Sequence, residues 1–478
     1  MYDVIVVGGG PSGINFAHGC ASEGLNVLLL ERDAVLGGCH RVCRVNGKFS
    51  EHGPREYFPA FTSFDRALKR AGLGGIEAFF APYKGVESSA GAVMPTVADL
   101  ATLAGSFIWF LVSDRAFDGS VKEWSEMNGV SQDTMTFLDD LCTRVEGAGS
   151  DRFAFRELLQ LGNQMALNFE MLQPLKPNDV GFLLEWEKAL KKERVDVRTN
   201  VIIKSLAQAD AKCVITDSDG NIYSAEKVVF AVPPMALATI KGATDAFGKD
   251  LPELAKRTAY NVYVSVAIEW DKKGRDDRSI SSKATEWGVI AIEMSATTDF
   301  GKPNSLLVSA SVTRLNTKSF VTGLTANETT SRTEFAKELF RQFLEISTGF
   351  SDVGATFVMN PNVFNDGAKW CDKDSAYINV PRTRAIPSDS ASMPCVFTIG
   401  AHNQMSPYEF TSIESAVANS DALLYKWFKN DKYAPIQATT LRTMLLLIML
   451  IIGIISLVVW KAYTTSPLYT KGSKVFSS

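Results

Sequence analysis

Three glycines and one acid near the start of the chain have the spacing of a nucleotide-binding site. The glycines follow the pattern Gly8-x-Gly10-x-x-Gly13, and Glu31 stands further along the same segment. In this pattern the first glycine permits a tight turn, the second lets the backbone approach a pyrophosphate, and the third lets a helix pack closely on a strand. The carboxylate of Glu31 could accept hydrogen bonds from both ribose hydroxyls and would repel a 2′-phosphate. These residues predict a dinucleotide site.

The surrounding sequence supplies the elements that would position these residues. Tyr2–Val7 is a short apolar run typical of a buried strand, and Asn26–Leu30 is a second one. Between them, Ser12–Glu23 has helical spacing and ends at Gly24. The start of this helix, with Ser12 in its first turn, would present free N–H groups and a partial positive charge to the phosphates.

Further features indicate that the dinucleotide is FAD. Arg32 follows the acid, and the doublet Gly37-Gly38 allows a second close approach of the backbone to the pyrophosphate. Near the end, residues 395–400 form a strand-like run that ends in Gly400. After a loop, a helix that includes Ile413 begins and extends to about residue 429. The N-terminus of that helix could face the flavin pyrimidine ring, where negative charge develops on reduction.

With these motifs the chain resembles the flavin amine oxidase superfamily over about residues 1–430. That group includes amine oxidases, protoporphyrinogen oxidase, and carotenoid desaturases and isomerases. The resemblance implies noncovalent FAD and a loop, Gly53-Pro54-Arg55, like that of protoporphyrinogen oxidase. It also implies that the backbone of Val201 bonds the adenine, and that residues 231–233 lead out of the cofactor domain.

The chain departs from the family pattern at two places. The arginine that often follows the glycine doublet is replaced by Cys39, with Arg41 two residues further on. The acid expected after Gly400 is absent, and His402 or Asn403 could replace it at the ribitol.

Catalytic residues are harder to identify, because flavin chemistry needs mainly orientation and exclusion of water. We select His52 and Arg55, which lie on a loop that the resemblance places near the flavin. Arg55 could pair with a substrate carboxylate or with the flavin. Trp370 and Tyr377 are candidates for the two aromatics that amine oxidases place around the flavin, with Tyr408 as a further one.

One feature of amine oxidases is missing from the sequence. In that group a lysine usually holds a water at flavin N5, but residues 260–270 contain no lysine, and the first one after them is Lys272. This gap counts against a standard amine oxidase.

Length and composition indicate an ordinary multidomain globular protein. The chain has 478 residues, 46% hydrophobic and 21% charged, and a net charge of −4, which favours no nucleic-acid partner. The fold class expected is α/β: a Rossmann-like FAD-binding domain interleaved with an α+β substrate domain. We expect residues 1–60, 178–240 and 388–432 in the first, and residues 61–177 and 241–387 in the second.

The seven cysteines are scattered and include no C-x-x-C pair, so the pattern supports neither a metal site nor a redox dithiol. Reduced thiols in a cytosol-facing protein are expected. Cys39 or Cys395 could in principle carry a covalent flavin, but their spacing does not support it.

Residues 443–460 are eighteen residues without a charge, which predicts a transmembrane helix. Arg442 and Lys461 flank it, and Trp460 has the position of an interfacial aromatic. Because the first strand begins at once after Met1, we expect no secretory signal. The folded part should then face the cytosol as a tail-anchored protein of the endoplasmic reticulum or the outer mitochondrial membrane.

A second apolar run, Leu100–Val112, is too short to span a bilayer. We interpret it as a core helix, with a helix dipping into the membrane as the alternative.

The sequence therefore predicts a membrane-tethered FAD-dependent oxidoreductase that moves hydride from a small, lipophilic substrate to flavin N5. A flavin amine or polyamine oxidase, a redox-neutral flavin isomerase and a binding protein with a vestigial site are the alternatives. The sequence does not decide whether the protein forms a homodimer.

Overall fold

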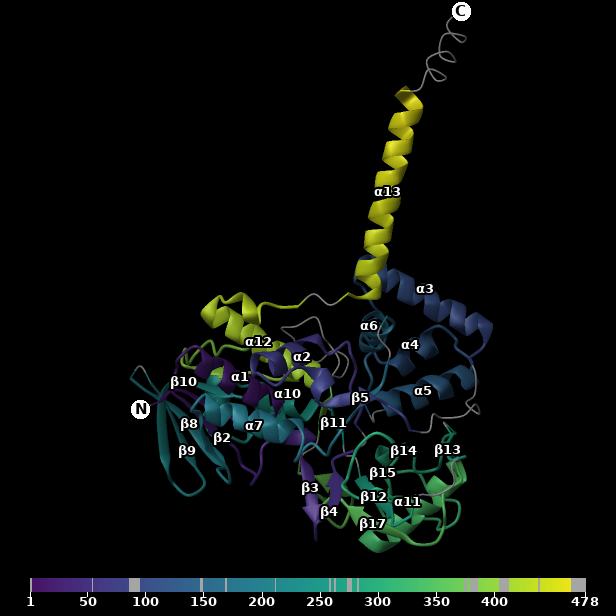
Figure 1. Cartoon of the computed structure of the whole chain (residues 1–478), viewed down its shortest axis with the longest axis horizontal. Coiled ribbons are helices and arrows are strands. Elements are labelled where there is room, and N and C mark those ends of the chain that lie inside the picture. Colours follow the sequence, from purple (N-terminus) through teal and green to yellow (C-terminus); the bar gives the residue numbers. More distant parts are fainter. Residues whose placement is uncertain are drawn as a thin grey trace, which may run out of the picture.

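The computed structural model describes residues 2–465 apart from a set of short gaps. The gaps are residues 54, 86–94, 147–148, 168–169, 211, 258, 262–263, 273–276, 282, 374–375, 379–385, 404–411 and 437–438. Figure 1 shows a folded body from which one long helix, α13, projects.

A seven-stranded sheet carries the glycine motif, which follows its strand β1. Its order is β7-β2-β1-β10-β9-β8, with β21 paired to β10. Strands β7, β2, β1, β10 and β21 are parallel, while β8, β9 and β10 form an antiparallel meander. The strands are β1 (Tyr2–Val7), β2 (Val27–Leu30), β7 (Asp196–Arg198), β8 (Ile203–Ala209), β9 (Lys212–Asp217), β10 (Ile222–Phe230) and β21 (Val396–Thr398).

Helices α1 (Pro11–Ser22), α7 (Phe182–Lys192) and α12 (Ile413–Phe428) pack together on this sheet. Residues on α1 that are fully buried, such as Ile14 and Phe16, meet Leu424 of α12 in one apolar core. The predicted strand–turn–helix–strand unit at the N-terminus is therefore confirmed, with boundaries within a few residues of those expected.

A second sheet, of order β14-β15-β12-β17, forms the lobe at the opposite end of the body from α13 (Figure 1). Its antiparallel strands are β12 (Val264–Trp270), β14 (Val289–Glu293), β15 (Leu306–Val312) and β17 (Ala355–Met359), and α11 (Arg332–Ile346) packs on it. The strand-like segments predicted around residues 260–270, 287–293 and 305–312 correspond to β12, β14 and β15.

A group of helices connects this lobe with the base of α13. It consists of α3 (Val97–Ser113), α4 (Val121–Met127), α5 (Gln132–Glu146) and α6 (Phe155–Met165). Trp124 and Phe155 stack at 4.4 Å between ring centroids in their shared core.

The remaining elements are short. The helices are α2 (Thr62–Arg70), α8 (Pro234–Ala238), α9 (Ala243–Phe247) and α10 (Leu251–Arg257). The strands are β3 (Val42–Val45), β4 (Lys48–Glu51), β5 (Phe80–Pro82), β6 (Leu172–Pro174), β11 (Ala259–Asn261), β13 (Ser279–Ile280), β16 (Ser347–Thr348), β18 (Val363–Asn365), β19 (Trp370–Asp372) and β20 (Ala376–Ile378).

The expectation that Leu100–Val112 is a core helix is wrong. The segment is helical, as α3, but only Phe110 and Leu111 are buried, whereas Ile108 and Trp109 are 61% and 59% exposed. Apolar composition alone does not show whether a partner covers the second face of a helix.

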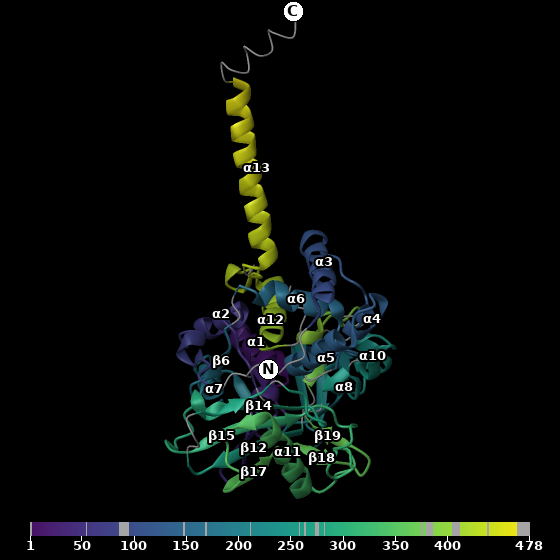
Figure 2. The same cartoon turned by 90° about the vertical axis from the view of Figure 1, so that its right-hand side faces the viewer.

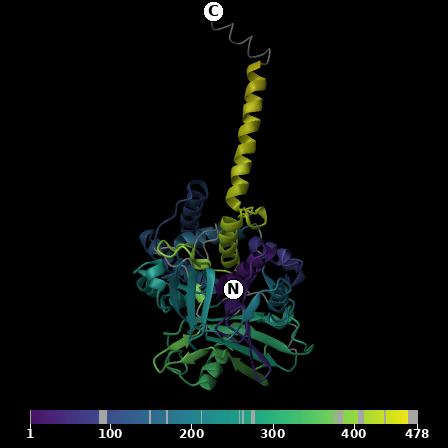
Figure 3. The same cartoon turned by 90° about the vertical axis from the view of Figure 1, so that its left-hand side faces the viewer.

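Helix α13 (Leu441–Thr465) contains a stretch, Leu441–Lys461, that is long and apolar enough to cross a membrane and has no part of its most apolar window buried in the protein. Figure 2 and Figure 3 show it leaving the body from the same end in views from either side.

The expectation of reduced thiols is wrong for two of the seven cysteines. Cys213 on β9 and Cys395, just before β21, form a buried disulfide across 182 residues of sequence. Cys20, Cys39, Cys43, Cys142 and Cys371 are not disulfide-bonded. Because the sulfur of Cys395 is bonded to Cys213, it cannot carry a covalent flavin.

Candidate functional site

The glycine turn after β1 is closely packed at Gly8 and Gly13 and open at Gly10. A Cβ on Gly13 would lie 1.9 Å from the carbonyl oxygen of Gly8, so α1 packs on the turn as closely as its backbone allows. Gly8 itself has φ of 109°, which favours glycine. A Cβ on Gly10 would instead meet Gly38 Cα as its nearest neighbour in the described chain, at 3.9 Å. The backbone of Gly10 therefore faces the cavity and is not packed against other residues.

The carboxylate of Glu31 is buried and holds the turn in place. Its Oε2 accepts a hydrogen bond from Gly9 N–H at 2.6 Å, and its Oε1 accepts one from Asp33 N–H at 2.9 Å. Burial raises the pKa of Glu31 despite these two bonds. The neighbouring Arg32 is half-exposed and donates to the Lys373 carbonyl at 2.9 Å.

The second glycine pair lies directly against the first. Gly37 N–H donates to the Gly9 carbonyl at 2.8 Å, and a Cβ on Gly38 would come within 3.1 Å of Gly10 Cα. Gly37 and Gly38 have φ of 122° and 53°, conformations that glycine adopts most readily. The two turns thus form one cradle of bare backbone.

The basic residue beside this cradle is Arg41, since Cys39 occupies the position where the family often has arginine. Arg41 Nη1 lies 2.9 Å from Asp33 Oδ2. Burial would raise the pKa of Asp33, but the charges of Arg41 and Arg32 outweigh it and lower that pKa. Arg41 and Cys39 both line the cavity described next.

One cavity of about 1470 Å³ extends from the cradle into the substrate lobe. Its cofactor end is lined by the glycine turn, Glu31, Val201 and the start of α12. The part of the lining that comes from α5, α6, β14 and Met171, which we call the far chamber, includes the apolar side chains of Leu141, Val145, Leu161, Met165, Met171, Ile290 and Ile292. A pocket of this size exceeds the usual range for one drug-sized ligand, so it can hold a cofactor and a substrate together.

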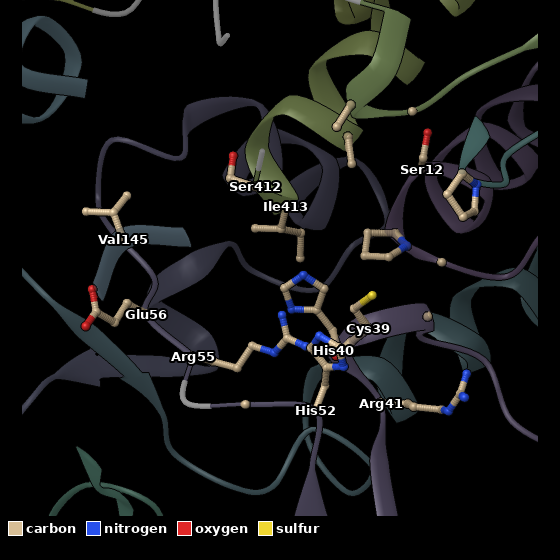
Figure 4. A pocket seen from close by; sticks show the side chains of 18 of the residues that line it. Ser12, Cys39, His40, Arg41, His52, Arg55, Glu56, Val145, Ser412 and Ile413 are labelled. Carbon is tan, nitrogen blue, oxygen red and sulfur yellow. Dashed lines mark hydrogen bonds between the residues drawn. The ribbon is translucent and has the colours of Figure 1, made fainter. Parts of the chain in front are cut away.

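His40, His52 and Arg55 meet in the middle of this cavity (Figure 4). The Arg55 guanidinium donates to the Cys39 carbonyl, which fixes it across the loop. His52 Nδ1 lies 2.9 Å from Asp372 Oδ2, and both side chains are buried. Gly53 also lines the cavity, whereas Pro54 lies outside the described residues.

The surroundings of the His40 side chain favour its neutral form. Burial, with the positive charge of Arg55, keeps the pKa of His40 well below its ordinary value. Its Nδ1 lies 3.0 Å from the Tyr57 hydroxyl, and its carbonyl accepts a hydrogen bond from Asn178 at 2.9 Å. The sequence analysis did not select His40 as a site residue.

Glu51 is the buried acid next to this cluster. Its Oε1 has no hydrogen-bond partner among the described residues, and burial raises the pKa of Glu51 to about 7. The Glu51 side chain is not among the described residues that line the cavity.

The C-terminal motif reaches the cavity as expected. Gly400, Ser412 and Ile413 line it, and Ser412 caps α12 by accepting a hydrogen bond from Ser415 N–H at 3.2 Å. Of the two substitutes for the missing acid, His402 lines the cavity, while Asn403 donates to the Ile386 carbonyl at 2.9 Å. Burial lowers the pKa of His402 to about 4.

Val201 lines the cavity, and one of its two backbone polar groups is already used within the protein. Its N–H donates to the Glu31 carbonyl at 2.9 Å. Its carbonyl oxygen is therefore the backbone group with which it could meet an adenine.

Of the three aromatic candidates, only Trp370 has a side chain among the described residues. Trp370 is buried in the core of the second sheet, where its Nε1 donates to the Ala326 carbonyl at 2.9 Å, and it is not among the described residues that line the cavity. The prediction that Trp370 faces the flavin is therefore wrong. Tyr377 belongs to β20, but its side chain is not described, and Tyr408 lies outside the described residues.

Sequence reasoning missed several polar residues of the far chamber. Arg314 Nη2, after β15, lies 2.8 Å from Asp140 Oδ1 on α5, which joins the two halves of the substrate lobe across the cavity. Lys283 and Tyr83 also line it. No local motif marks these residues, because they meet only through tertiary packing.

Comparison with known proteins agrees with this geometry. Residues 6–70 match the family model of the NAD(P)-binding Rossmann-like domain, and residues 183–333 match that of the flavin containing amine oxidoreductases. No curated protein matches the chain.

Solved structures share the fold at low sequence identity. Putrescine oxidase bound to putrescine is 13% identical over 90% of this chain and 99% of its own, with a TM-score of 0.63. Cyclohexylamine oxidase from Brevibacterium oxydans IH-35A is 12% identical over 90% and 100%, with a TM-score of 0.63. A protein described as a protoporphyrinogen oxidase, from Exiguobacterium sp. 255-15, is 15% identical over 89% and 98%, with a TM-score of 0.61.

The glycine cradle, the long cavity and the matched families define an FAD-dependent oxidoreductase. Residues 183–333 carry the match to the flavin containing amine oxidoreductases, and the chain shares its fold with solved amine oxidases.

Proposed function

We propose that this protein is a membrane-anchored oxidoreductase that uses noncovalent FAD to take hydride from a C–H or C–N centre of a lipophilic organic substrate. The observation that carries the proposal is the single cavity that joins the glycine cradle to an apolar chamber. A cofactor bound at the cradle would extend toward that chamber.

The residues at the cofactor end fit FAD. Bare backbone at Gly10 and Gly38 admits the pyrophosphate, and Glu31 lies where a ribose would follow. The N-terminus of α12 at Ile413 would favour negative charge on the pyrimidine ring. Bound FAD supplies a two-electron acceptor at N5.

The protein's own contribution is then orientation and exclusion of water. His40, kept neutral by burial and by Arg55, can hold a hydrogen bond without adding a second positive charge. Arg55, fixed on the Cys39 carbonyl, can orient a substrate carboxylate or the flavin. His52 lies on the same loop, and its contact with the buried Asp372 carboxylate holds that loop to β19.

The apolar far chamber supports a lipophilic substrate, such as a tetrapyrrole, an isoprenoid or a fatty acyl chain. An amine substrate is the second candidate. Lys283 lines the cavity and could replace the lysine missing from β12, and Asp140 supplies a carboxylate, although Arg314 is already paired with it. A redox-neutral isomerase would use the same cofactor site without net oxidation.

For the rest of the architecture we propose the boundaries expected from the sequence, with residues 1–60, 178–240 and 388–432 as the FAD-binding domain. We also propose that α13 anchors the body to the endoplasmic reticulum or the outer mitochondrial membrane, with the body in the cytosol. The Cys213–Cys395 disulfide counts against this orientation, since disulfides persist mainly in oxidising compartments. Protease treatment of sealed membranes tests it: a body degraded without detergent faces the cytosol.

The catalytic proposal is tested by anaerobic titration of the full-length, solubilised protein with tetrapyrroles, amines and polyenes. Bleaching of the oxidised flavin spectrum by one class would identify the substrate, and bleaching by amines alone would establish the second candidate. The matched variant is Arg55→Lys, which keeps the charge and loses the planar fork. Slower bleaching with unchanged flavin content would place Arg55 at the substrate, whereas a protein that binds no flavin would overturn the proposal.

A further inference from the structure

We propose that α3 is a second membrane-contacting element, which lies in the lipid interface beside the base of α13. The partner is the bilayer itself. This inference rests on the proposed anchoring by α13 and is independent of the flavin chemistry.

Helix α3 has one packed face and one uncovered apolar face. On the packed face, Leu103, Phe107, Phe110 and Leu111 join the core of the helical group. On the other face, Val97, Ile108, Trp109 and Val112 are 85%, 61%, 59% and 67% exposed. The sequence from Leu100 to Ser113 contains no charged residue. Soluble surfaces rarely expose such a continuous apolar strip.

Helix α3 is fixed to the folded body by hydrogen bonds and by close packing. At its N-terminus, Thr96 accepts a hydrogen bond from Asp99 N–H at 3.1 Å, and Asp99 accepts bonds from Ser131 and Thr134 hydroxyls at 2.5 Å and 2.7 Å. In the middle, a Cβ on Gly162 of α6 would come within 3.3 Å of the Phe107 ring, so the two helices pack closely. The apolar strip is therefore a fixed surface of the folded body.

Arg442, at the start of α13, fixes the two helices to each other. Its guanidinium donates to the Phe110 carbonyl and, at 2.9 Å, to the Leu111 carbonyl, both on α3. It also lies 2.8 Å from Asp114 Oδ1 and 4.8 Å from the centre of the Phe110 ring. The backbone N–H of Arg442 donates to Asn163 of α6 at 2.9 Å.

This attachment sets the depth of α3. The apolar part of α13 begins directly after Arg442 and is uncovered by the protein. A bilayer that accepts α13 must therefore have its surface close to Arg442, which is bonded to the last turn of α3. Figure 2 shows α3 at the end of the body from which α13 leaves. Trp109, which directly precedes Phe110 on α3, has the residue type that favours membrane interfaces.

The test is quenching of tryptophan fluorescence by lipids brominated on their acyl chains, with the full-length protein in phosphatidylcholine nanodiscs. The Trp109 component is the difference between the wild type and Trp109→Phe, and the Trp460 component is obtained in the same way with Trp460→Phe. The matched control is Phe320→Trp, because Phe320 is 91% exposed on the loop between β15 and α11, in the lobe far from α13. Flavin absorbance is recorded for each variant.

We expect brominated lipid to reduce both the Trp109 and Trp460 components by about half, since rings at the interface contact the upper acyl chains. The emission added by Phe320→Trp should be unchanged by lipid and quenched by iodide in solution. If Trp460 is quenched and Trp109 is not, α13 is an anchor but α3 does not contact lipid, and the inference is overturned. Two protein copies per disc with Trp109 shielded from lipid and iodide would also overturn it, in favour of a second copy. If neither is quenched, the anchor itself is wrong, whatever the flavin does.

Discussion

Glu31 Oε2 accepts a hydrogen bond from the backbone N–H of Gly9 at 2.6 Å, and so ties the end of β2 to the turn after β1. The same carboxylate holds the Asp33 N–H at 2.9 Å through its other oxygen. The acid therefore shapes the cradle itself, in addition to the ribose contact that we propose for it.

Replacement of Glu31 by glutamine should weaken flavin binding without unfolding the protein. Glutamine is similar in size but has one oxygen and no charge, so at least one of the two N–H groups loses a charged acceptor. Hydrogen bonds to charged groups are worth about 1.5–3 kcal/mol, which corresponds to roughly a 10- to 150-fold rise in Kd. Titration of the flavin-free protein with FAD measures this. An unchanged Kd would show that Glu31 has no part in the cofactor site.

Two glycines of the same turn should respond in opposite ways to alanine. Gly13→Ala puts a methyl group 1.9 Å from the Gly8 carbonyl oxygen, so we expect a lower melting temperature and loss of flavin. Gly10→Ala has room within the protein but fills the cradle opposite Gly38, so flavin binding should fall while the melting temperature of the flavin-free protein stays unchanged. Thermal unfolding and flavin titration of both variants distinguish the two effects. Equal losses of stability would contradict an open cradle at Gly10.

Glu51 should make the protein less stable as pH rises. Its pKa is about 7 in the folded protein because of burial, against 4.5 for an ordinary glutamate. The folded state then binds more protons than the unfolded state between those values, so stability is lost as pH rises through this window. Each unit of pKa shift corresponds to about 1.4 kcal/mol, so Glu51→Gln should raise the melting temperature at pH 8 and have little effect at pH 4.5. Melting curves across this range provide the check, and a gain that did not depend on pH would contradict it.

The Cys213–Cys395 disulfide should stabilise the cofactor sheet. It joins β9 to the chain entering β21 across 182 residues, and loss of a native disulfide costs about 2–5 kcal/mol. Reduction with dithiothreitol should therefore lower the melting temperature of the wild type and leave the double variant Cys213→Ala/Cys395→Ala unchanged. Free-thiol counting before and after reduction identifies the bond. Seven reactive thiols in the unfolded, unreduced protein would show that the disulfide does not form.

The predictable part of the site consists of residues that lie close together in the sequence. Gly8, Gly13 and Glu31 work through neighbours on adjacent elements of one short unit, so the sequence contains most of the geometry. The start of α12 at Ile413 was predictable for the same reason, because a strand that ends in glycine and a helix follow one another closely.

The errors come from contacts between distant segments. Cys213 and Cys395 lie on parts of one sheet that only the completed fold brings together. The apolar pattern of α3 shows that one face packs, but not that the other remains uncovered. Trp370 has the residue type of a flavin-facing aromatic, yet the packing of Phe335 at 5.0 Å and the bond to Ala326 place it in a core.

The pairing of β10 with β21 has a consequence for the order of synthesis. Val228–Phe230 pairs with β1 on one side and with Val396–Thr398 on the other, so this edge has no partner until most of the chain has been made. An unpaired strand edge is prone to associate with other chains. The nascent protein must therefore protect this edge while the whole substrate lobe is translated. Closure of the cofactor sheet comes only shortly before α13 is synthesised, so capture of the flavin and arrival at the membrane are late and nearly simultaneous events.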